Sequence, residues 1–263
     1  MYNTVGYSTQ DYNRLSAEIN SRIENECKVN PYNKYHSHTI TMNDVVNAID
    51  DLKQGKKEEN GLCSNHFKHG TKRMMIILAL FFNSMVVHGI APDEMLLGTM
   101  IPLIKDTRGK KQCSDNYRAL TIGTGLAKIL DIIILNQQKD KLETSYLQFG
   151  FKKKSSTTMC TFMALETIER YTKSGSEVHV LLLDASKAFD RVDYIKLFDK
   201  LLDRGMCPLT VRLLFSMYTQ QELQVKWVNH ISDRFNVTNG VRQGRVLSPL
   251  LFSFFLLMNY LRS

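Results

Sequence analysis

An unbroken apolar run, VHVLLLD, occupies residues 178–184 and ends in an aspartate. A continuous β-branched and leucine run of this length is typical of a strand that is buried on both faces of a sheet. The pattern then becomes helical, because Asp193 can cap a helix that Gly205 closes. This stretch therefore predicts a strand followed by a helix, with Asp184 at the end of the strand.

The rest of the chain mixes helical and strand patterns, which predicts an α+β fold. Two pairs of short apolar runs indicate β-hairpins, and little apolar periodicity before residue 42 indicates a loosely ordered lead-in over residues 1–41. The hairpins are expected at residues 96–106 with 116–122, joined by a basic tip, and at 223–228 with 234–237. Helices are expected over residues 42–55, 74–87, 125–142, 157–173 and 208–218, and again from Ser248. Thr41 or Asn43 can cap the first of them.

Composition favours an anionic partner but does not identify one. The 263 residues are 43% hydrophobic, which is normal for a protein with a buried core, and 34 Lys+Arg against 26 Asp+Glu give a formal charge of +8. Nucleic acid is the commonest partner of such a chain. A basic solvated surface without any partner explains the charge equally well.

Cysteine spacing and hydropathy disfavour several classes of protein. The five cysteines are scattered without a C-x-x-C pair, which argues against structural zinc and for a reducing compartment. The N-terminus has no signal sequence, and the longest apolar run, residues 74–90, falls short of the ~20 residues that span a bilayer. We expect an intracellular protein, in the cytoplasm, the nucleus or both, that does not associate with membranes.

Asp184 is the residue best suited to carry chemistry. A carboxylate at the end of a rigid strand can hold a divalent cation, which binds hard oxygen ligands and phosphate together. The alternative interpretation is that Asp184 only caps the turn that follows the strand.

Two segments resemble the palm motifs of reverse transcriptases of the non-LTR, LINE-like retrotransposon kind. DASKAFD, from residue 184, is similar to the first motif, and NGVRQGRVLSPLLF, from residue 239, is similar to the second. The resemblance implies that Asp184 binds the catalytic magnesium ions and that Phe189 lies beneath the sugar of the incoming nucleotide. Phe189 can instead be a simple core residue.

In the second motif, the resemblance implies that Gln243 contacts the incoming nucleotide and the template region. The glycines flanking the loop, Gly240 and Gly244, would let the backbone approach a ligand closely. The helix that follows would offer phosphate its free N–H groups and its dipole. Gln243 and Gly244 are therefore predicted nucleotide-binding residues.

Upstream segments agree with this resemblance. Lys105 and Arg118 stand on the two arms of the first predicted hairpin, and NYRALT resembles the family's NYRPIS element, with Ala119 in place of the proline. The likeness implies that both cations hold the triphosphate, Arg118 as a fork donor and Lys105 as a point charge.

A further segment, QFGF at residues 148–151, resembles a family element that lies near the template. Gln148 and Gly150 would then contact nucleic acid. The basic run beside them would neutralise backbone phosphates, or would form only a solvated turn, and consists of Lys152, Lys153 and Lys154.

The resemblance implies a right-hand polymerase, with fingers over residues 42–174 and a partial palm over residues 175–263 whose antiparallel sheet is backed by helices. It also implies an RNA-directed DNA polymerase that uses an RNA template, a DNA primer, deoxynucleoside triphosphates and two Mg²⁺ ions. The family carries further catalytic aspartates in an (F/Y)-A-D-D hairpin, but no Asp-Asp pair follows Asp184 here. We therefore expect this chain alone to be incomplete as a polymerase, since two metals need more than one carboxylate. The alternative is an inactive nucleic-acid-binding remnant of the same fold.

Overall fold

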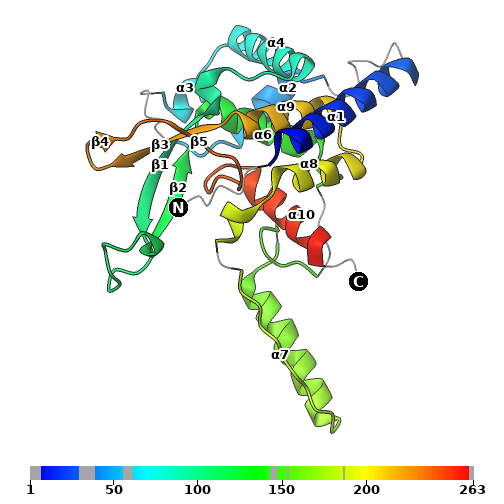
Figure 1. The fold of residues 1–263 in the computed structure, drawn as a ribbon, viewed down its shortest axis with the longest axis vertical. Helices are drawn as coiled ribbons and strands as arrows, with labels where there is room; N and C mark the ends of the chain where they lie inside the picture. Colours follow the sequence, from blue (N-terminus) through cyan, green and yellow to red (C-terminus); the bar gives the residue numbers. More distant parts are fainter. Residues whose placement is uncertain are drawn as a thin grey trace.

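The structure is a computed structural model that describes residues 7–29, 39–55, 62–142, 147–152, 154–185 and 187–260. Helices form most of the body, and a small sheet lies at one side of it (Figure 1). The elements are, in chain order, α1 (Thr9–Val29), α2 (Met42–Asp50), α3 (Ser64–Lys68), α4 (Lys72–His88), α5 (Asp93–Leu96), β1 (Leu97–Ile104), η1 (Ser114–Asn116), β2 (Tyr117–Ile122), α6 (Gly125–Gln137), α7 (Thr157–Lys173), η2 (Ala188–Arg191), α8 (Tyr194–Asp203), α9 (Pro208–Thr219), β3 (Glu222–Trp227), β4 (His230–Ile231), β5 (Phe235–Asn236) and α10 (Ser248–Tyr260).

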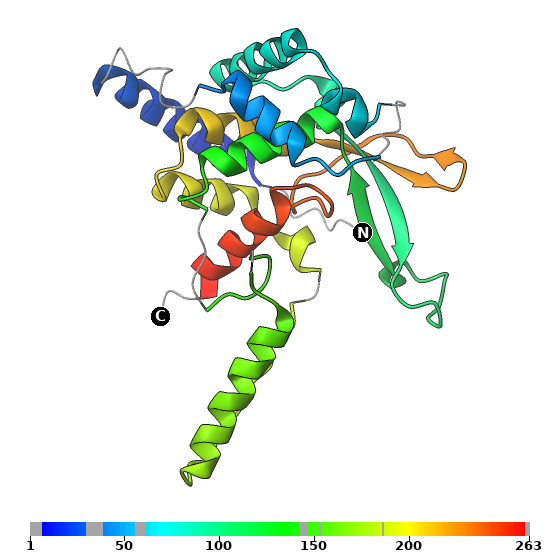
Figure 2. The same cartoon turned by 180° about the vertical axis from the view of Figure 1, so that it is seen from behind.

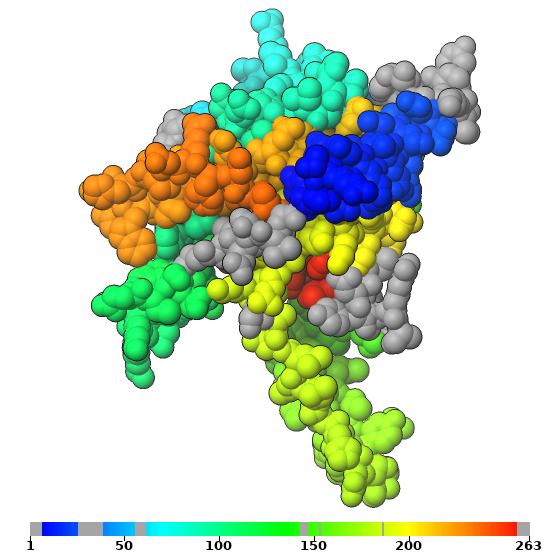
Figure 3. Space-filling view, in the orientation of Figure 1, coloured from blue at the N-terminus to red at the C-terminus, as the bar shows by residue number. Residues whose placement is uncertain are grey.

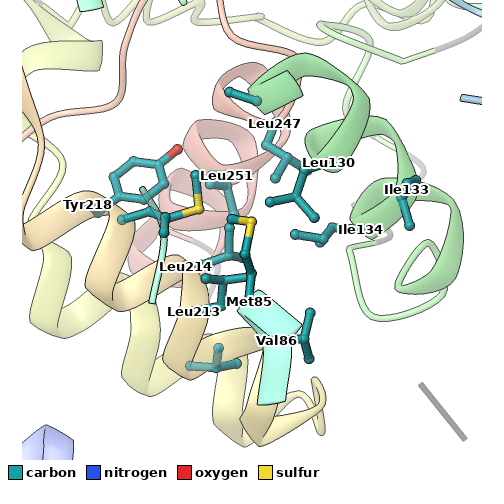
Figure 4. Close-up of a cluster of buried hydrophobic side chains, with 14 of the residues drawn as sticks. Met85, Val86, Leu130, Ile133, Ile134, Leu213, Leu214, Tyr218, Leu247 and Leu251 are labelled. Atoms are coloured by element: carbon teal, nitrogen blue, oxygen red, sulfur yellow. The ribbon is translucent and has the colours of Figure 1, made fainter. Parts of the chain in front are cut away.

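One hydrophobic core joins the helices of the body. Side chains from α4, α6, α9 and α10 meet at its centre, where Leu130, Leu214 and Leu251 are almost fully buried (Figure 4). Burying large aliphatic side chains in this way is the main favourable term in folding. The core therefore fixes the relative positions of the segments that adjoin these helices, such as β2 before α6 and β3 after α9.

The sheet places a long hairpin beside the body. The strand order of the sheet is β2-β1-β3-β4, with β5 also paired to β3. β1 runs antiparallel to β2 and parallel to β3, so the central strand is held on both edges. From the back, the free ends of β1 and β2 extend away from the helices (Figure 2). This mixture of helices and a sheet confirms the expected α+β class.

Local signals predicted several elements correctly. The side chain of Thr41 caps α2, and the side chain of Asp193 caps α8 by accepting from the backbone N–H of Lys196. Both expected hairpins are present, as β1 with β2 and as β3 with β5, and α7 has the predicted bounds. Two helices are shorter than predicted, since α2 ends at Asp50 and α6 at Gln137.

The expected loosely ordered lead-in is wrong for residues 9–29, which form the helix α1. Two apolar side chains of this polar helix, Leu15 and Ile19, are buried in the core. Ion pairs add to the contact, because Arg14 lies 2.7 Å from Asp199 and Arg22 also reaches α8. Packing against α8 and α9 thus stabilises a helix whose own sequence shows little periodicity.

The predicted buried strand at 178–184 is also wrong. Those residues follow α7 and belong to neither a helix nor a strand, and Leu181, Leu182 and Leu183 are 81–89% exposed. Together with α7 this segment forms an arm that stands clear of the body (Figure 3). An apolar run becomes a buried strand only when other strands pair with its edges, and no strand in the described part of the chain pairs with this one. We call residues 157–184 the arm.

Candidate active site

The β1–β2 hairpin brings its predicted phosphate ligands to one end of the sheet. Lys105 directly follows β1, and its backbone N–H donates to the carbonyl of Asn116 at 2.8 Å. Arg118 lies opposite Leu103 in the register of the hairpin, and both cations are exposed. The Nζ of Lys105 donates to the carbonyl of Asp115 at 2.8 Å. Lys105, just after β1, and Arg118, in β2, therefore lie at the same end of the hairpin and reach solvent.

An ion pair joins this hairpin to the loop that follows Asp184. Lys187 Nζ lies 2.8 Å from the carboxylate of Asp115, and the hydrogen bond and charge of Lys187 lower the pKa of Asp115. The backbone of Lys187 has φ +51°, a left-handed conformation that is uncommon for a residue with a side chain. An exposed ion pair contributes little stability, so this one shows that the two segments are adjacent but does not by itself hold them together.

The loop after Asp184 also pairs with the glycine-rich loop at residue 240. Val241 donates its backbone N–H to the carbonyl of Phe189 at 2.8 Å, and Gly240 donates to Val192 at 2.8 Å. The approach is close, because a Cβ on Gly240 would lie 2.9 Å from Cα of Asp190. Burial raises the pKa of Asp190, while the charges of Lys187 and Lys105 oppose that rise. The two loops resembling polymerase motifs therefore contact each other beside the hairpin.

A third contact joins the hairpin to Gln243 and Gly244. The backbone N–H of Thr121 in β2 donates to the carbonyl of Gln243 at 2.7 Å. Gly244 has φ +111°, and a Cβ there would lie 2.5 Å from the carbonyl oxygen of Thr121. Only glycine fits such a position without strain. Gln243 is half-buried and Gly244 is exposed, so the peptide can meet a ligand.

Phe189 occupies an aromatic cluster. Its ring stacks on Phe252, with centroids 4.4 Å apart and planes 19° apart, and meets the ring of Phe151 edge-on at 5.9 Å. These contacts favour the alternative interpretation of Phe189 as a core residue. They do not test its place beneath a sugar, which stays a prediction. Phe151 belongs to the QFGF segment, so the cluster also brings that segment to the loop that follows Asp184.

Asp184 itself is exposed at the end of the arm. The sequence predicted that Asp184 would lie at the edge of a sheet. It does not, because the apolar run before it forms no strand. Across the described ranges, no group of three or more His, Cys, Asp or Glu side chains is arranged to hold a metal ion. Its role as a magnesium ligand therefore stays a prediction.

The segment expected to contact nucleic acid is a tight turn. The side-chain amide of Gln148 donates to the carbonyl of Gly150 at 3.1 Å. Lys152 and Lys154 are exposed, and Lys154 has φ +63°. Lys153 lies outside the described residues. An exposed basic turn fits both the phosphate-binding interpretation and the alternative of a solvated turn.

Sequence reasoning missed three buried charged residues near this site. They are Asp131, Arg242 and Arg245, with exposures of 1%, 2% and 8%. The sequence does carry one hint of these buried charges, because an arginine stands on each side of Gln243 and Gly244. The Asp131 carboxylate pairs with Arg245, three residues before α10, and the expected phosphate site at the start of α10 stays a prediction.

Comparison with known proteins identifies the family of the chain. The model of the family described as "Reverse transcriptase (RNA-dependent DNA polymerase)" matches residues 108–261, more than half of the chain, and the chain belongs to this family. Within the family, it is a reverse transcriptase domain of the non-LTR retrotransposon kind, as its sequence indicated.

Its relatives are polymerases of mobile elements. The chain is 28% identical to "RNA-directed DNA polymerase from mobile element jockey" of Drosophila funebris over 82% of its own length and 24% of the relative. It is 22% identical to "Probable RNA-directed DNA polymerase from transposon BS" and 24% identical to that from transposon X-element, both of Drosophila melanogaster. These matches cover 94% and 93% of the chain, and 27% and 26% of the relatives. The chain thus spans about a quarter of the length of the curated relatives it matches.

Proposed function

We propose that this domain binds a deoxynucleoside triphosphate where the β1–β2 hairpin meets the loops at 184–193 and 239–247, for RNA-templated DNA synthesis. One observation carries the proposal: three segments far apart in the sequence are joined there. Lys187 pairs with Asp115, Val241 bonds to Phe189, and Thr121 bonds to Gln243. The exposed cations and the open Gly244 peptide all lie on these segments.

Each group has a distinct proposed task. Arg118 presents a fork of donors that matches two phosphate oxygens, and Lys105 adds a point charge. Lys105 would leave the carbonyl of Asp115 to reach a phosphate, which its flexible stem allows. Gln243 would donate from its side-chain amide to the nucleotide, while Gly244 leaves the backbone open beside it.

Reverse transcriptase domains generally use divalent metal ions. Asp184 fits such an ion only in part, because an exposed carboxylate is a hard oxygen donor but is a single one. In our proposal Asp184 holds Mg²⁺ together with the triphosphate oxygens. The ion would supply neutralisation of the phosphate charge.

The template side of the proposal rests on the basic turn. Lys152 and Lys154 would contact the backbone of an RNA template without reading its sequence, and Gln148 and Gly150 would lie beside it. The aromatic contact between Phe151 and Phe189 links this turn to the nucleotide site. In this arrangement residues 42–174 act as fingers and residues 175–263 as part of a palm.

Equilibrium binding of a fluorescent deoxynucleoside triphosphate in Mg²⁺ tests the proposal. Arg118→Ala should raise Kd tenfold or more, because a hydrogen bond to a charged group is worth roughly 1.5–3 kcal/mol. Arg73→Ala, which removes an exposed arginine from α4, should leave Kd unchanged. Equal Kd values for the wild type and Arg118→Ala would contradict the site. Salt-sensitive RNA binding without any nucleotide binding would instead favour the nucleic-acid-binding remnant.

A further inference from the structure

Two buried arginines flank the Gln243–Gly244 peptide. Arg242 precedes it and Arg245 follows it, and both are more than nine-tenths buried. Arginine is almost never fully buried unless it is paired, because removing its charge from water is costly. The partners of each arginine therefore show what the burial achieves.

Arg245 forms a buried ion pair with α6. Its Nε and Nη2 donate to the two carboxylate oxygens of Asp131 at 3.1 and 2.9 Å. Burial raises the pKa of Asp131, while Arg245 and the backbone N–H groups of Val246 and Leu247 oppose that rise. Burial lowers the pKa of Arg245, but the Asp131 carboxylate outweighs that effect and the pKa is raised, so the arginine stays charged. The Asp131 carboxylate on α6 thus holds the residue that directly follows Gly244.

Arg242 holds the other end of the peptide to the sheet. Its Nε donates to the side-chain oxygen of Gln221 at 2.5 Å, and its Nη2 donates to the carbonyls of Leu96 and Glu222. Leu96 is the last residue of α5, directly before β1, while Gln221 directly precedes β3 and Glu222 begins it. The side-chain amide of Gln221 in turn donates to the hydroxyl of Tyr194. The arginine before Gln243 is therefore bound to a different element from the arginine after Gly244.

We propose that Asp131 and Arg245, with Arg242 at the other end, are positioning residues that hold the Gln243–Gly244 peptide in place for the incoming nucleotide. The inference rests on the proposed nucleotide site. We call the Asp131–Arg245 pair the loop clamp. Buried ion pairs are poor sources of stability, since apolar residues of similar volume often replace them without loss. The clamp does fix direction, because two donors of the Arg245 guanidinium bind the two oxygens of one carboxylate.

Hydrogen exchange and nucleotide binding test the clamp in the full 263-residue chain. Asp131→Asn keeps the side-chain shape but removes the charge. It should speed amide exchange at residues 243–247 tenfold or more and raise Kd for a fluorescent deoxynucleoside triphosphate by at least tenfold. Salt-dependent binding to single-stranded RNA, which uses other residues, should not change. Unchanged exchange at 243–247 in this variant would overturn the clamp.

A matched variant separates positioning from stability. Ile133 is buried on the same helix and points away from Leu247 (Figure 4). Ile133→Ala should lower Tm at least as much as Asp131→Asn, yet leave exchange at 243–247 and nucleotide Kd at the wild-type values below the melting transition. If Ile133→Ala changes both readouts as Asp131→Asn does, the pair is merely structural and the inference is wrong.

A double variant gives a second separation. Asp131→Leu with Arg245→Met replaces the clamp by apolar side chains, so Tm should exceed that of Arg245→Met alone, which leaves a buried carboxylate unpaired. Nucleotide Kd should stay raised in the double variant. Wild-type Kd there would overturn the inference. If the wild-type chain binds no nucleotide, the proposed function fails, while the exchange data still decide whether the clamp holds the loop.

Discussion

Gly244→Ala should destabilise the protein more than the substitution of alanine for Gly205 or Gly123. The new Cβ would lie 2.5 Å from the carbonyl oxygen of Thr121, and the backbone has φ +111°. A side chain in such a conformation costs about 1–3 kcal/mol. Relieving the clash would also stretch the hydrogen bond from Thr121 to Gln243, which contributes about 0.5–1.5 kcal/mol. The free energy of unfolding should therefore fall by about 2–4 kcal/mol.

Two other glycines separate these causes. Gly205 has φ +73° but nothing lies within 4 Å of its Cβ position, and Gly123 has neither a positive φ nor a close neighbour. Gly205→Ala should cost only the backbone strain, about 1 kcal/mol. Gly123→Ala should be neutral or stabilise by up to about 1 kcal/mol. Urea denaturation followed by circular dichroism gives all three values. Equal losses for Gly244→Ala and Gly205→Ala would refute the close approach of the loop to β2.

Three further predictions concern the motif loop and the arm. Phe189→Val should lower the free energy of unfolding by about 1–2 kcal/mol, while Phe162→Val, on the arm, should cost almost nothing. A tenfold fall in the ratio of ribonucleotide Kd to deoxynucleotide Kd in Phe189→Val would support the sugar contact, and an unchanged ratio would contradict it. Burial raises the native pKa of Asp190 above its unfolded value of 3.8, so the free energy of unfolding falls as pH rises from 3.8 through the native pKa. Asp190→Asn should remove that fall in denaturation curves recorded at a series of pH values, and an unchanged dependence on pH would show another group to be responsible. Leu182→Lys, at an 89% exposed position, should lower self-association in light scattering more than Leu80→Lys does. Equal effects would argue against the arm as an association-prone apolar surface.

The elements predicted correctly are those with local signals. Thr41 and Asp193 cap their helices through backbone groups three residues ahead, so the sequence near each cap contains the whole interaction. The β1–β2 hairpin has the same property, since its two apolar runs flank one polar tip. The family was also identified from the residues of the two motif loops, and the family match, which spans both loops, confirms that identification.

What the sequence did not reveal depends on distant partners. α1 has few apolar positions, and its order comes from Leu15, Ile19 and pairs such as Arg14 with Asp199, 185 residues away. The run at 178–184 has a strand pattern, yet pattern alone cannot supply the neighbouring strands that would bury it. The loop clamp joins residues 114 positions apart. No local rule connects such residues, because the helical core brings them together.

Photo-crosslinking with an azido-substituted deoxyadenosine triphosphate tests the convergence of the three segments most directly. After irradiation in Mg²⁺ and digestion, mass spectrometry identifies the peptides that carry the nucleotide. We predict labelled peptides from the β1–β2 hairpin, around Lys105 and Arg118, and from the loop around Gln243, both suppressed by unlabelled deoxynucleoside triphosphate. Competable labelling confined to other parts of the chain, or labelling that unlabelled nucleotide does not suppress, would contradict the account.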